Sequence, residues 1–180
     1  MQRRGKFRLS PLMVLAVIVL ALAAAYQVAH WIHESSIDSS LAEYAGLIRT
    51  HAAANGLPPA LVAKVIRAES GGDPHAVSRT GARGLMQIMP IALEEVRRHR
   101  DIPAGNLTDP AYNIRVGTAY LAIMMDTFDN DRWLALAAYN AGPGRIAKLR
   151  KAHPDLTSRQ LVLKHAPRET AGYVKTILED

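Results

Sequence analysis

The sequence contains no cysteine. This absence excludes disulfides, thiol nucleophiles, zinc sites with cysteine ligands and a lipidated N-terminal cysteine, but it leaves the redox compartment open. The chain also lacks the HExxH pattern of zinc proteases, the GxSxG pattern of serine hydrolases and the Gly-rich loop of P-loop nucleotide-binding proteins. Of its seven histidines only His30 and His33 lie close together, beside an apolar segment. We therefore expect neither a metal nor a cofactor.

Most of the excess basic charge lies at one end of the chain. The net charge is +6, but Arg3, Arg4, Lys6 and Arg8 lie in the first ten residues, and the rest of the chain carries 18 of the 22 basic residues against all 16 acidic ones. No cluster of Arg and Lys with interleaved aromatic residues occurs after residue 10. This argues against a nucleic acid partner.

The N-terminal segment is apolar and uncharged from residue 11 to residue 29. Residues 12–25 have the length of a signal peptide, with small residues between Ala21 and Ala25 that suit cleavage. Extended to Ala29, the segment reaches the roughly 20 residues that span a bilayer, and Trp31 would suit the far interface. Under both interpretations the positive-inside rule places everything after about residue 30 outside the cytoplasm. We expect residues 1–30 to be a signal peptide or transmembrane anchor, residues 31–40 a polar linker, and residues 41–180 the folded domain.

No stretch of the chain alternates polar and apolar residues for long enough to predict a strand. Apolar spacing, proline at helix starts and glycine at helix ends predict an all-α domain. The predicted helices cover residues 41–54, 59–70, 90–98, 110–128, 131–140, 143–149, 158–165 and 168–178. A capping-box pattern at Ser40 would start the first of them. Residues 70–83 should form a loop, and Gly84 to Met89 a short helical turn.

Glu69 is a carboxylate at the end of an apolar helix. Counting back by four residues gives Val65 and Leu61, so the side chain of Glu69 projects from the face that should meet the core. Burial and the helix dipole would both raise the pKa of this carboxyl, which suits a proton donor near neutral pH. The alternative is a Glu turned sideways at a frayed helix end.

Glycosidases usually carry two carboxylates, one on either side of the scissile bond. The candidates for a second are Asp73, Asp109 and Asp155, and each stands beside proline or glycine in a cap or turn context. A single acid favours chemistry in which the substrate supplies its own nucleophile.

Several motifs together resemble one enzyme family. They are Glu69-Ser70 with Ser78, GARGLMQIMP at 81–90, Asn113-Ile114-x-x-Gly117-x-x-Tyr120-Leu121, Ala137-Ala138-Tyr139-Asn140-Ala141-Gly142, and Glu169-Thr170-x-x-Tyr173-Val174. In this order and spacing they resemble the soluble lytic transglycosylase-like (SLT, family 1) domain of the lysozyme-like superfamily. The resemblance covers residues 57–178. It departs at Ile91, where the family commonly has a threonine that caps a helix.

The resemblance implies a lysozyme-like helical fold and cleavage of the MurNAc–GlcNAc β-1,4 bond of peptidoglycan without water, which leaves a 1,6-anhydro-MurNAc end. It makes Glu69 the sole acid and base. Ser78 would bind the substrate near its N-acetyl or muramyl group, with turn stabilisation as the alternative role.

The same resemblance assigns further substrate-binding residues. Gln87 would offer its amide to the sugar or to Glu69, and Met86 would wall the cleft. Tyr139 would place its hydroxyl near Glu69 or an N-acetyl oxygen, Asn140 would bind substrate or cap its helix, and Tyr173 would line the cleft or pack. Asn113 and Gly117 are expected to be structural.

Two other functions stay open on the sequence. One is a hydrolytic muramidase of the goose-type lysozyme kind on the same fold. The other is a glycan-binding subunit of an envelope-spanning secretion or conjugation complex. The expected partners are peptidoglycan glycan strands, the membrane through the N-terminal segment, and such a complex. The expected location is the periplasmic side of the cell envelope, by inner-membrane anchoring or by export.

Overall fold

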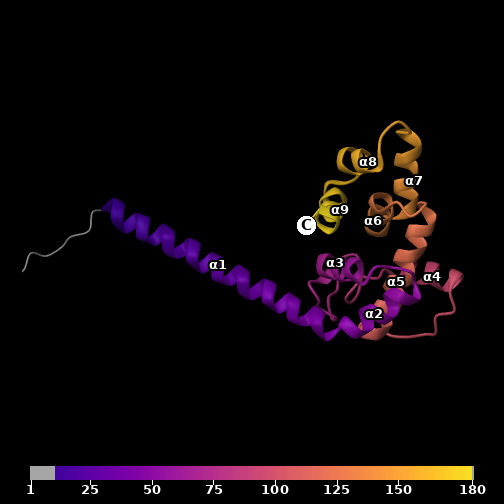
Figure 1. Cartoon of the computed structure of the whole chain (residues 1–180), viewed down its shortest axis with the longest axis horizontal. Coiled ribbons are helices and arrows are strands. Elements are labelled where there is room, and N and C mark those ends of the chain that lie inside the picture. Colours follow the sequence, from indigo (N-terminus) through magenta and orange to yellow (C-terminus); the bar gives the residue numbers. More distant parts are fainter. Residues whose placement is uncertain (1–10, 180) are drawn as a thin grey trace, which may run out of the picture. The chain divides into compact units, whose positions relative to one another are not determined.

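The computed structural model describes residues 11–179, and the basic residues of the first ten positions lie outside the described residues. These described residues form helices and connecting loops without a strand (Figure 1). The all-α fold class is therefore confirmed. The chain divides into two compact units, residues 1–39 and residues 40–180.

The described part of the first unit, residues 11–39, belongs to helix α1 (Pro11–Glu43). Between residues 11 and 179 it is the one helix long and apolar enough to cross a membrane, and a signal sequence near an N-terminus has the same properties. Its apolar side chains are exposed from Leu12 to Ile32.

The polar residues 31–40, expected to form a linker, are helical and continue α1. The expected helix start at Ser40 is wrong, because α1 runs to Glu43 and α2 begins at Ala45. Serine and aspartate cost only a few tenths of a kcal/mol each at exposed helical positions, and extending an existing helix avoids the cost of a new nucleus. A capping pattern inside a continuing helix therefore has no end to cap.

The second unit contains the remaining helices. They are α2 (Ala45–Ala54), α3 (Pro59–Ser70), α4 (Pro90–His99), α5 (Pro110–Thr127), α6 (Arg132–Ala141), α7 (Pro143–Ala152), α8 (Ser158–His165) and α9 (Arg168–Glu179). The long helix α5 is buried along most of its length and packs against α2, α4 and α6. Helix α6 in turn packs against α7, α8 and α9, and α3 contacts α2 and α9.

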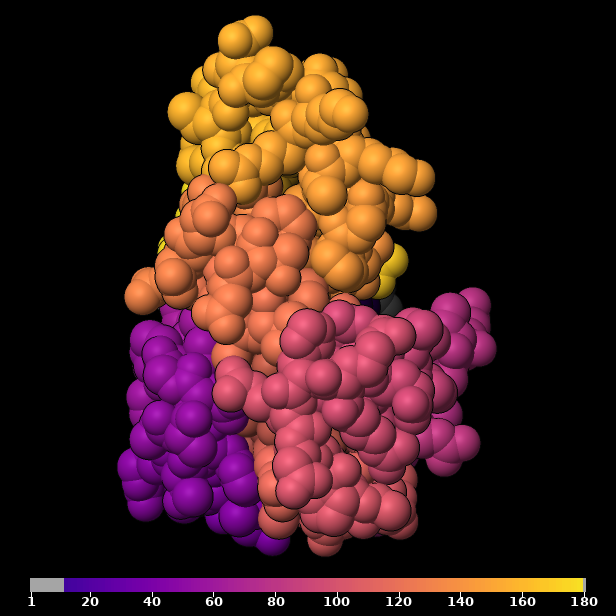
Figure 2. Space-filling view, turned by 90° about the vertical axis from the view of Figure 1, so that its right-hand side faces the viewer, coloured from indigo at the N-terminus to yellow at the C-terminus, as the bar shows by residue number. Residues whose placement is uncertain are grey.

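Within this unit α2–α5 group in one half and α6–α9 in the other (Figure 1). Figure 2 shows the division on one face, where gold and yellow C-terminal segments lie above the pink segments around residues 80–110. Because α3 contacts α9 and α5 contacts α6, the two halves share one core.

Capping residues stand where the sequence predicts helix starts. The Asp109 carboxylate accepts a 2.7 Å hydrogen bond from the Tyr112 amide at the start of α5, and the Asp131 carboxylate accepts a 3.1 Å bond from the Leu134 amide in α6. Satisfying these free amides typically contributes about 1 kcal/mol per helix. The role of Asp109 as a cap rather than a catalytic acid is thereby explained.

Residues 71–83 form the loop expected over 70–83, but Gly84–Met89 differ from the expected helical turn. Arg83 bridges antiparallel to both Val77 and Ile88, so the segment is a tight, strand-like turn. A Cβ at Gly84 would overlap the Leu107 carbonyl and the Asn113 amide, and Gly84 has a φ of +75°. Glycine alone fits that position, since it has no Cβ and tolerates positive φ.

Candidate active site

A cleft of about 530 Å³ lies between α3 and the 71–89 loop on one side and α6 and α9 on the other. Its lining includes six of the seven site residues proposed from the sequence: Glu69, Ser78, Gln87, Tyr139, Asn140 and Tyr173. They come from segments up to about a hundred residues apart in the chain. Folding therefore brings the separate sequence motifs to one place.

Glu69 lies in the last turn of α3, half-buried at the base of this cleft. Burial raises the pKa of the Glu69 carboxyl to about 7; the Tyr173 hydroxyl opposes this by hydrogen bonding, and the negative charge of Glu169 adds to it. Burial dominates because a carboxylate removed from water loses the solvation that favours its charged form. A carboxyl with such a pKa is protonated often enough near neutral pH to donate a proton and can then act as a base.

Tyr173 on α9 faces Glu69 across the cleft. Its hydroxyl is buried and has no hydrogen-bond partner of ordinary geometry among the described residues, yet it lies close enough to lower the pKa of Glu69. The two groups are thus adjacent without an ideal hydrogen bond in the free protein. Such contacts commonly tighten when substrate is bound.

The loop wall of the cleft is held by its own polar side chains. The Ser78 hydroxyl accepts a 2.9 Å hydrogen bond from the Ala82 amide and shares a 3.0 Å bond with the Thr80 hydroxyl. The Gln87 side-chain nitrogen donates to the carbonyls of Ala76 and Gly84, at 3.1 and 2.9 Å. The amide nitrogen of Gln87 therefore braces the loop, and its side-chain oxygen is the atom left for a ligand.

Met86 does not line the cleft, contrary to its expected role as a wall. Its side chain is fully buried and rests against Gly117 of α5, where a Cβ would overlap the Met86 side chain. The Met86 amide donates a 2.7 Å hydrogen bond to the Asn113 side chain, and its carbonyl accepts a 2.8 Å bond from the Tyr139 hydroxyl. Met86 is thus the point where α5 and α6 hold the loop.

Tyr139 of α6 and Asn113 of α5 therefore both hold the loop at Met86. The Tyr139 hydroxyl is directed to Met86, not to Glu69, although burial and the nearby Glu69 charge both raise the pKa of the Tyr139 phenol well above its usual value. Asn113 is fully buried and its amide nitrogen also donates to the carbonyls of Arg83 and Leu107, at 2.9 and 2.8 Å. Its structural position agrees with the expectation.

Three polar residues in the cleft were given no site role from the sequence, although Glu169 belongs to one of the motifs: Thr80, Glu169 and Thr176. Glu169 and Thr176 lie four residues before and three residues after Tyr173, so all three share one face of α9. That spacing was available in the sequence and would have predicted Glu169 as a second carboxylate in the cleft. Asp73, Asp109 and Asp155, the candidates considered, do not line it.

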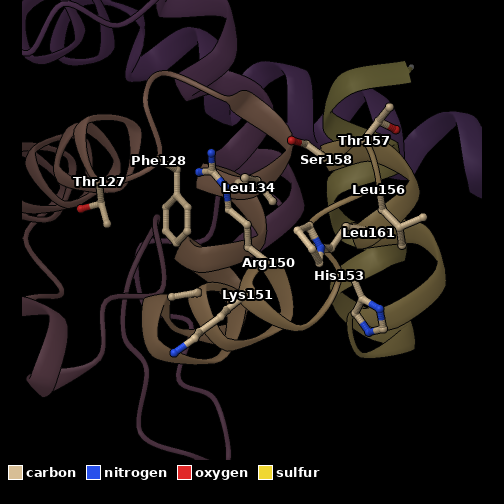
Figure 3. A pocket seen from close by; sticks show the side chains of 12 residues that line it. Thr127, Phe128, Leu134, Arg150, Lys151, His153, Leu156, Thr157, Ser158 and Leu161 are labelled. Atoms are coloured by element: carbon tan, nitrogen blue, oxygen red, sulfur yellow. The ribbon is translucent and has the colours of Figure 1, made fainter.

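A second cavity, of about 600 Å³, lies between the ends of α5 and α7 and the beginnings of α6 and α8 (Figure 3). Its polar lining is cationic or neutral, with Arg150, Lys151 and His153, and no carboxylate is found among the described residues that line it. This cavity is slightly larger than the cleft, but none of the described residues that line it has a carboxyl group. We therefore place the candidate active site in the cleft. Within residues 11–179 no group of three or more His, Asp or Glu side chains could hold a metal ion.

The family profile named "Transglycosylase SLT domain" matches residues 46–162. The soluble lytic murein transglycosylase of Escherichia coli K12 is 35% identical over 140 residues, which cover 75% of this chain and 22% of that protein. Membrane-bound lytic murein transglycosylase C of Shigella sonnei is 34% identical over 125 residues, covering 63% of this chain and 35% of the relative. The chain thus spans about a fifth to a third of the length of these curated relatives.

The similar solved structures are also lytic transglycosylases. The 70 kDa soluble lytic transglycosylase of Escherichia coli superposes with a TM-score of 0.72 at 31% identity, over 86% of this chain and 28% of that one. An inactive Glu-to-Gln mutant of the lytic transglycosylase Slt from Pseudomonas aeruginosa superposes with a TM-score of 0.69 at 35% identity, over 74% of this chain and 22% of that one.

Proposed function

The chain belongs to the transglycosylase SLT domain family, and on that premise we propose that it is a peptidoglycan lytic transglycosylase. It cleaves the β-1,4 bond between MurNAc and GlcNAc without water and leaves a 1,6-anhydro-MurNAc end. The observation that carries this proposal is the half-buried Glu69 carboxyl with a pKa of about 7 in a cleft of about 530 Å³.

One carboxyl performs both proton transfers. Protonated Glu69 gives its proton to the glycosidic oxygen as the bond from that oxygen to C1 of MurNAc breaks. The resulting carboxylate then takes the proton of the C6 hydroxyl while that oxygen forms a bond to C1. The leaving sugar has gained one proton, Glu69 is again protonated, and no water is consumed.

The other cleft residues bind and orient the sugars. The Gln87 side-chain oxygen accepts from a sugar hydroxyl, since its nitrogen is engaged in the loop. Ser78 and Asn140 bind polar groups of the ring carrying the scissile bond, and Tyr173 supports the ionised form of Glu69. Tyr139 acts indirectly, by holding Met86 and with it the loop wall.

Glu169 keeps hydrolysis as a second candidate function. It is a second carboxylate lining the same cleft, and a hydrolytic muramidase would use such a group to activate water. Glu169 is exposed at the first turn of α9, whereas a base that activates a bound water is usually held within the site. This difference favours internal attack by the substrate.

Mass spectrometry of muropeptides released from purified sacculi tests the proposal. Anhydro ends are lighter than reducing ends by one water, and we expect anhydro ends from the wild type and no release by Glu69→Gln. Reducing ends alone, lost on Glu169→Gln, would establish the hydrolytic muramidase instead. Glycan binding without release of either product would leave the protein as a glycan-binding subunit.

For the location, we propose that α1 anchors or exports the chain so that residues 40–180 act on the periplasmic side of the cell envelope. A membrane-bound enzyme is among the relatives, and the basic residues before α1 favour this orientation. The test is a fusion, after residue 180, of a phosphatase that is active only outside the cytoplasm. We expect the fused phosphatase to be active. We further propose that the protein associates with an envelope-spanning secretion or conjugation complex. Crosslinking in intact cells tests this association.

A further inference from the structure

A hydrogen bond joins α9 to α6 at the edge of the cleft lining. The Thr170 hydroxyl, on a side chain that is 2% exposed, donates to the side-chain oxygen of Asn140 at 2.8 Å. Asn140 lines the cleft, and Thr170 does not. The bond therefore links a residue outside the site to one inside it.

The direction of this bond decides whether Asn140 offers its side-chain oxygen or its side-chain nitrogen to a ligand. An Asn side chain carries an oxygen that accepts and a nitrogen that donates two hydrogen bonds. The Thr170 hydroxyl donates to no other group among the described residues. If the Asn140 amide rotated by half a turn, the buried Thr170 proton would lose its acceptor, and an unpaired buried donor is strongly disfavoured. Asn140 is thereby held with its oxygen towards Thr170. Its side-chain nitrogen has no hydrogen-bond partner among the described residues and is not among the fully buried unpaired atoms, so in this cleft-lining residue it is the group left for a ligand.

We propose that Thr170 is a positioning residue that makes Asn140 present hydrogen-bond donors, and that these donors recognise the acetamido carbonyl oxygen of a substrate sugar. An N–H pair calls for a neutral oxygen acceptor, and the acetamido carbonyl is the strongest such acceptor on an N-acetylated sugar. The choice of sugar ligand rests on the proposed function; the orientation of Asn140 does not.

Binding measured in a Glu69→Gln background, where no turnover occurs, tests this directly. The probes are N-acetylated chito-oligosaccharides and the same oligomers after de-N-acetylation, with dissociation constants from calorimetry. Thr170→Val, which keeps the shape and removes the hydroxyl, should weaken binding of the N-acetylated probe about five- to tenfold and leave the other probe unchanged. Thr170→Ser should restore the preference.

A merely structural role for Thr170 gives a different pattern. If the hydroxyl only fastens α9 to α6, Thr170→Val weakens both probes equally or neither, and either result overturns the proposal. The proposal also fails if Thr170→Val still weakens N-acetyl binding after Asn140→Ala, because the effect must pass through Asn140. Absence of any binding of the N-acetylated probe overturns it as well.

Turnover gives an independent readout with Glu69 intact. Thr170→Val should raise KM about five- to tenfold and change kcat less than twofold, because this bond is made in the ground state and the transition state alike. A fall in kcat at unchanged KM would contradict the assignment. If the wild type releases no muropeptides, the proposed lytic activity fails while the binding experiment still decides the role of Thr170.

Discussion

The two cavities of the second unit are alike in volume and opposite in chemistry. The cleft at Glu69 measures about 530 Å³ and holds two carboxylates and two tyrosines, whereas the cavity at Arg150 measures about 600 Å³ and is lined, among the described residues, by cationic side chains and no acid. Size alone would favour the second. The difference is that one cleft moves the pKa of a carboxyl to near neutrality, and a proton donor is what glycosidic cleavage requires.

The two cavities also differ in how their walls are built. The loop that forms one wall of the cleft is fastened at the buried Met86, by Asn113 of α5 and Tyr139 of α6. The Arg150 side chain is half-exposed, and its partner is a more exposed Asp129 at 3.4 Å. Exposed pairs of this kind contribute little to stability. The candidate chemistry thus lies beside a loop that buried hydrogen bonds hold in place.

Removing the acid of the cleft should have the largest effect. Glu69→Gln keeps the size of the side chain but cannot transfer a proton, so we expect kcat to fall at least about a thousandfold. Release of soluble muropeptides from labelled sacculi measures the rate. A variant that retains a tenth of the activity would remove the basis for choosing this cleft.

The same variant should gain stability at alkaline pH. The folded-state pKa of Glu69 is about 7 and exceeds the ordinary value of 4.5. The contribution of protonated Glu69 to folding stability is therefore fully present below about pH 4.5 and is lost as pH rises through 7. Glu69→Gln should match the wild type at pH 4 and be about 1–3 kcal/mol more stable at pH 8. Urea unfolding at both values tests this, and equal stability at pH 8 would mean that Glu69 is not effectively buried.

Asn113→Ala should loosen the wall of the cleft. It removes two buried hydrogen bonds, to the Met86 amide and the Leu107 carbonyl, and a partly buried one to the Arg83 carbonyl, so we expect a loss of about 2–4 kcal/mol. Thermal unfolding measures the loss. Asn106→Ala is a matched control, because Asn106 is exposed and makes one local bond to the Thr108 amide. Equal losses for both variants would argue against a rigidly supported wall.

Tyr173→Phe should move the pH profile rather than abolish activity. The Tyr173 hydroxyl lowers the pKa of Glu69, so its removal should raise that pKa and shift the alkaline limb of kcat/KM upwards from about pH 7. Tyr139→Phe, which loses the bond to Met86, should lower the melting temperature and leave that limb in place. A shift in the Tyr139 variant alone would reverse the roles of the two tyrosines.

The smallest effect is expected in the second cavity. Arg150→Ala and Lys151→Ala should change muropeptide release less than twofold and unfolding free energy by no more than about 0.5 kcal/mol. Their side chains are exposed, and Lys151 makes no ion pair among the described residues. A tenfold loss of lysis in either variant would show that the cationic cavity takes part in the reaction.

Most helices could be predicted because their ends carry local signals. Asp109 and Asp131 cap the helices they precede, and proline begins α3, α4, α5 and α7. The failures lie where local signals compete with their surroundings. Ser40 resembles a cap but stands inside a helix that was already propagating, and Gly84–Met89 resembles a helical turn but is held by long-range bonds to Asn113 and Tyr139.

The sequence by itself predicted the direction of the pKa shift of Glu69 from its place on an apolar helix face. Its resemblance to the SLT family implied that Ser78, Gln87, Asn140 and Tyr173 share a site with Glu69, and all of them line the cleft. Only the tertiary structure decided where each polar atom points. Met86 faces inward because Gly117 leaves room for its side chain. The Tyr139 hydroxyl donates to the Met86 carbonyl, and the Thr170 hydroxyl donates to the side-chain oxygen of Asn140. The physical reason is that hydrogen-bond direction depends on partners far away in the chain, which spacing within one helix cannot encode.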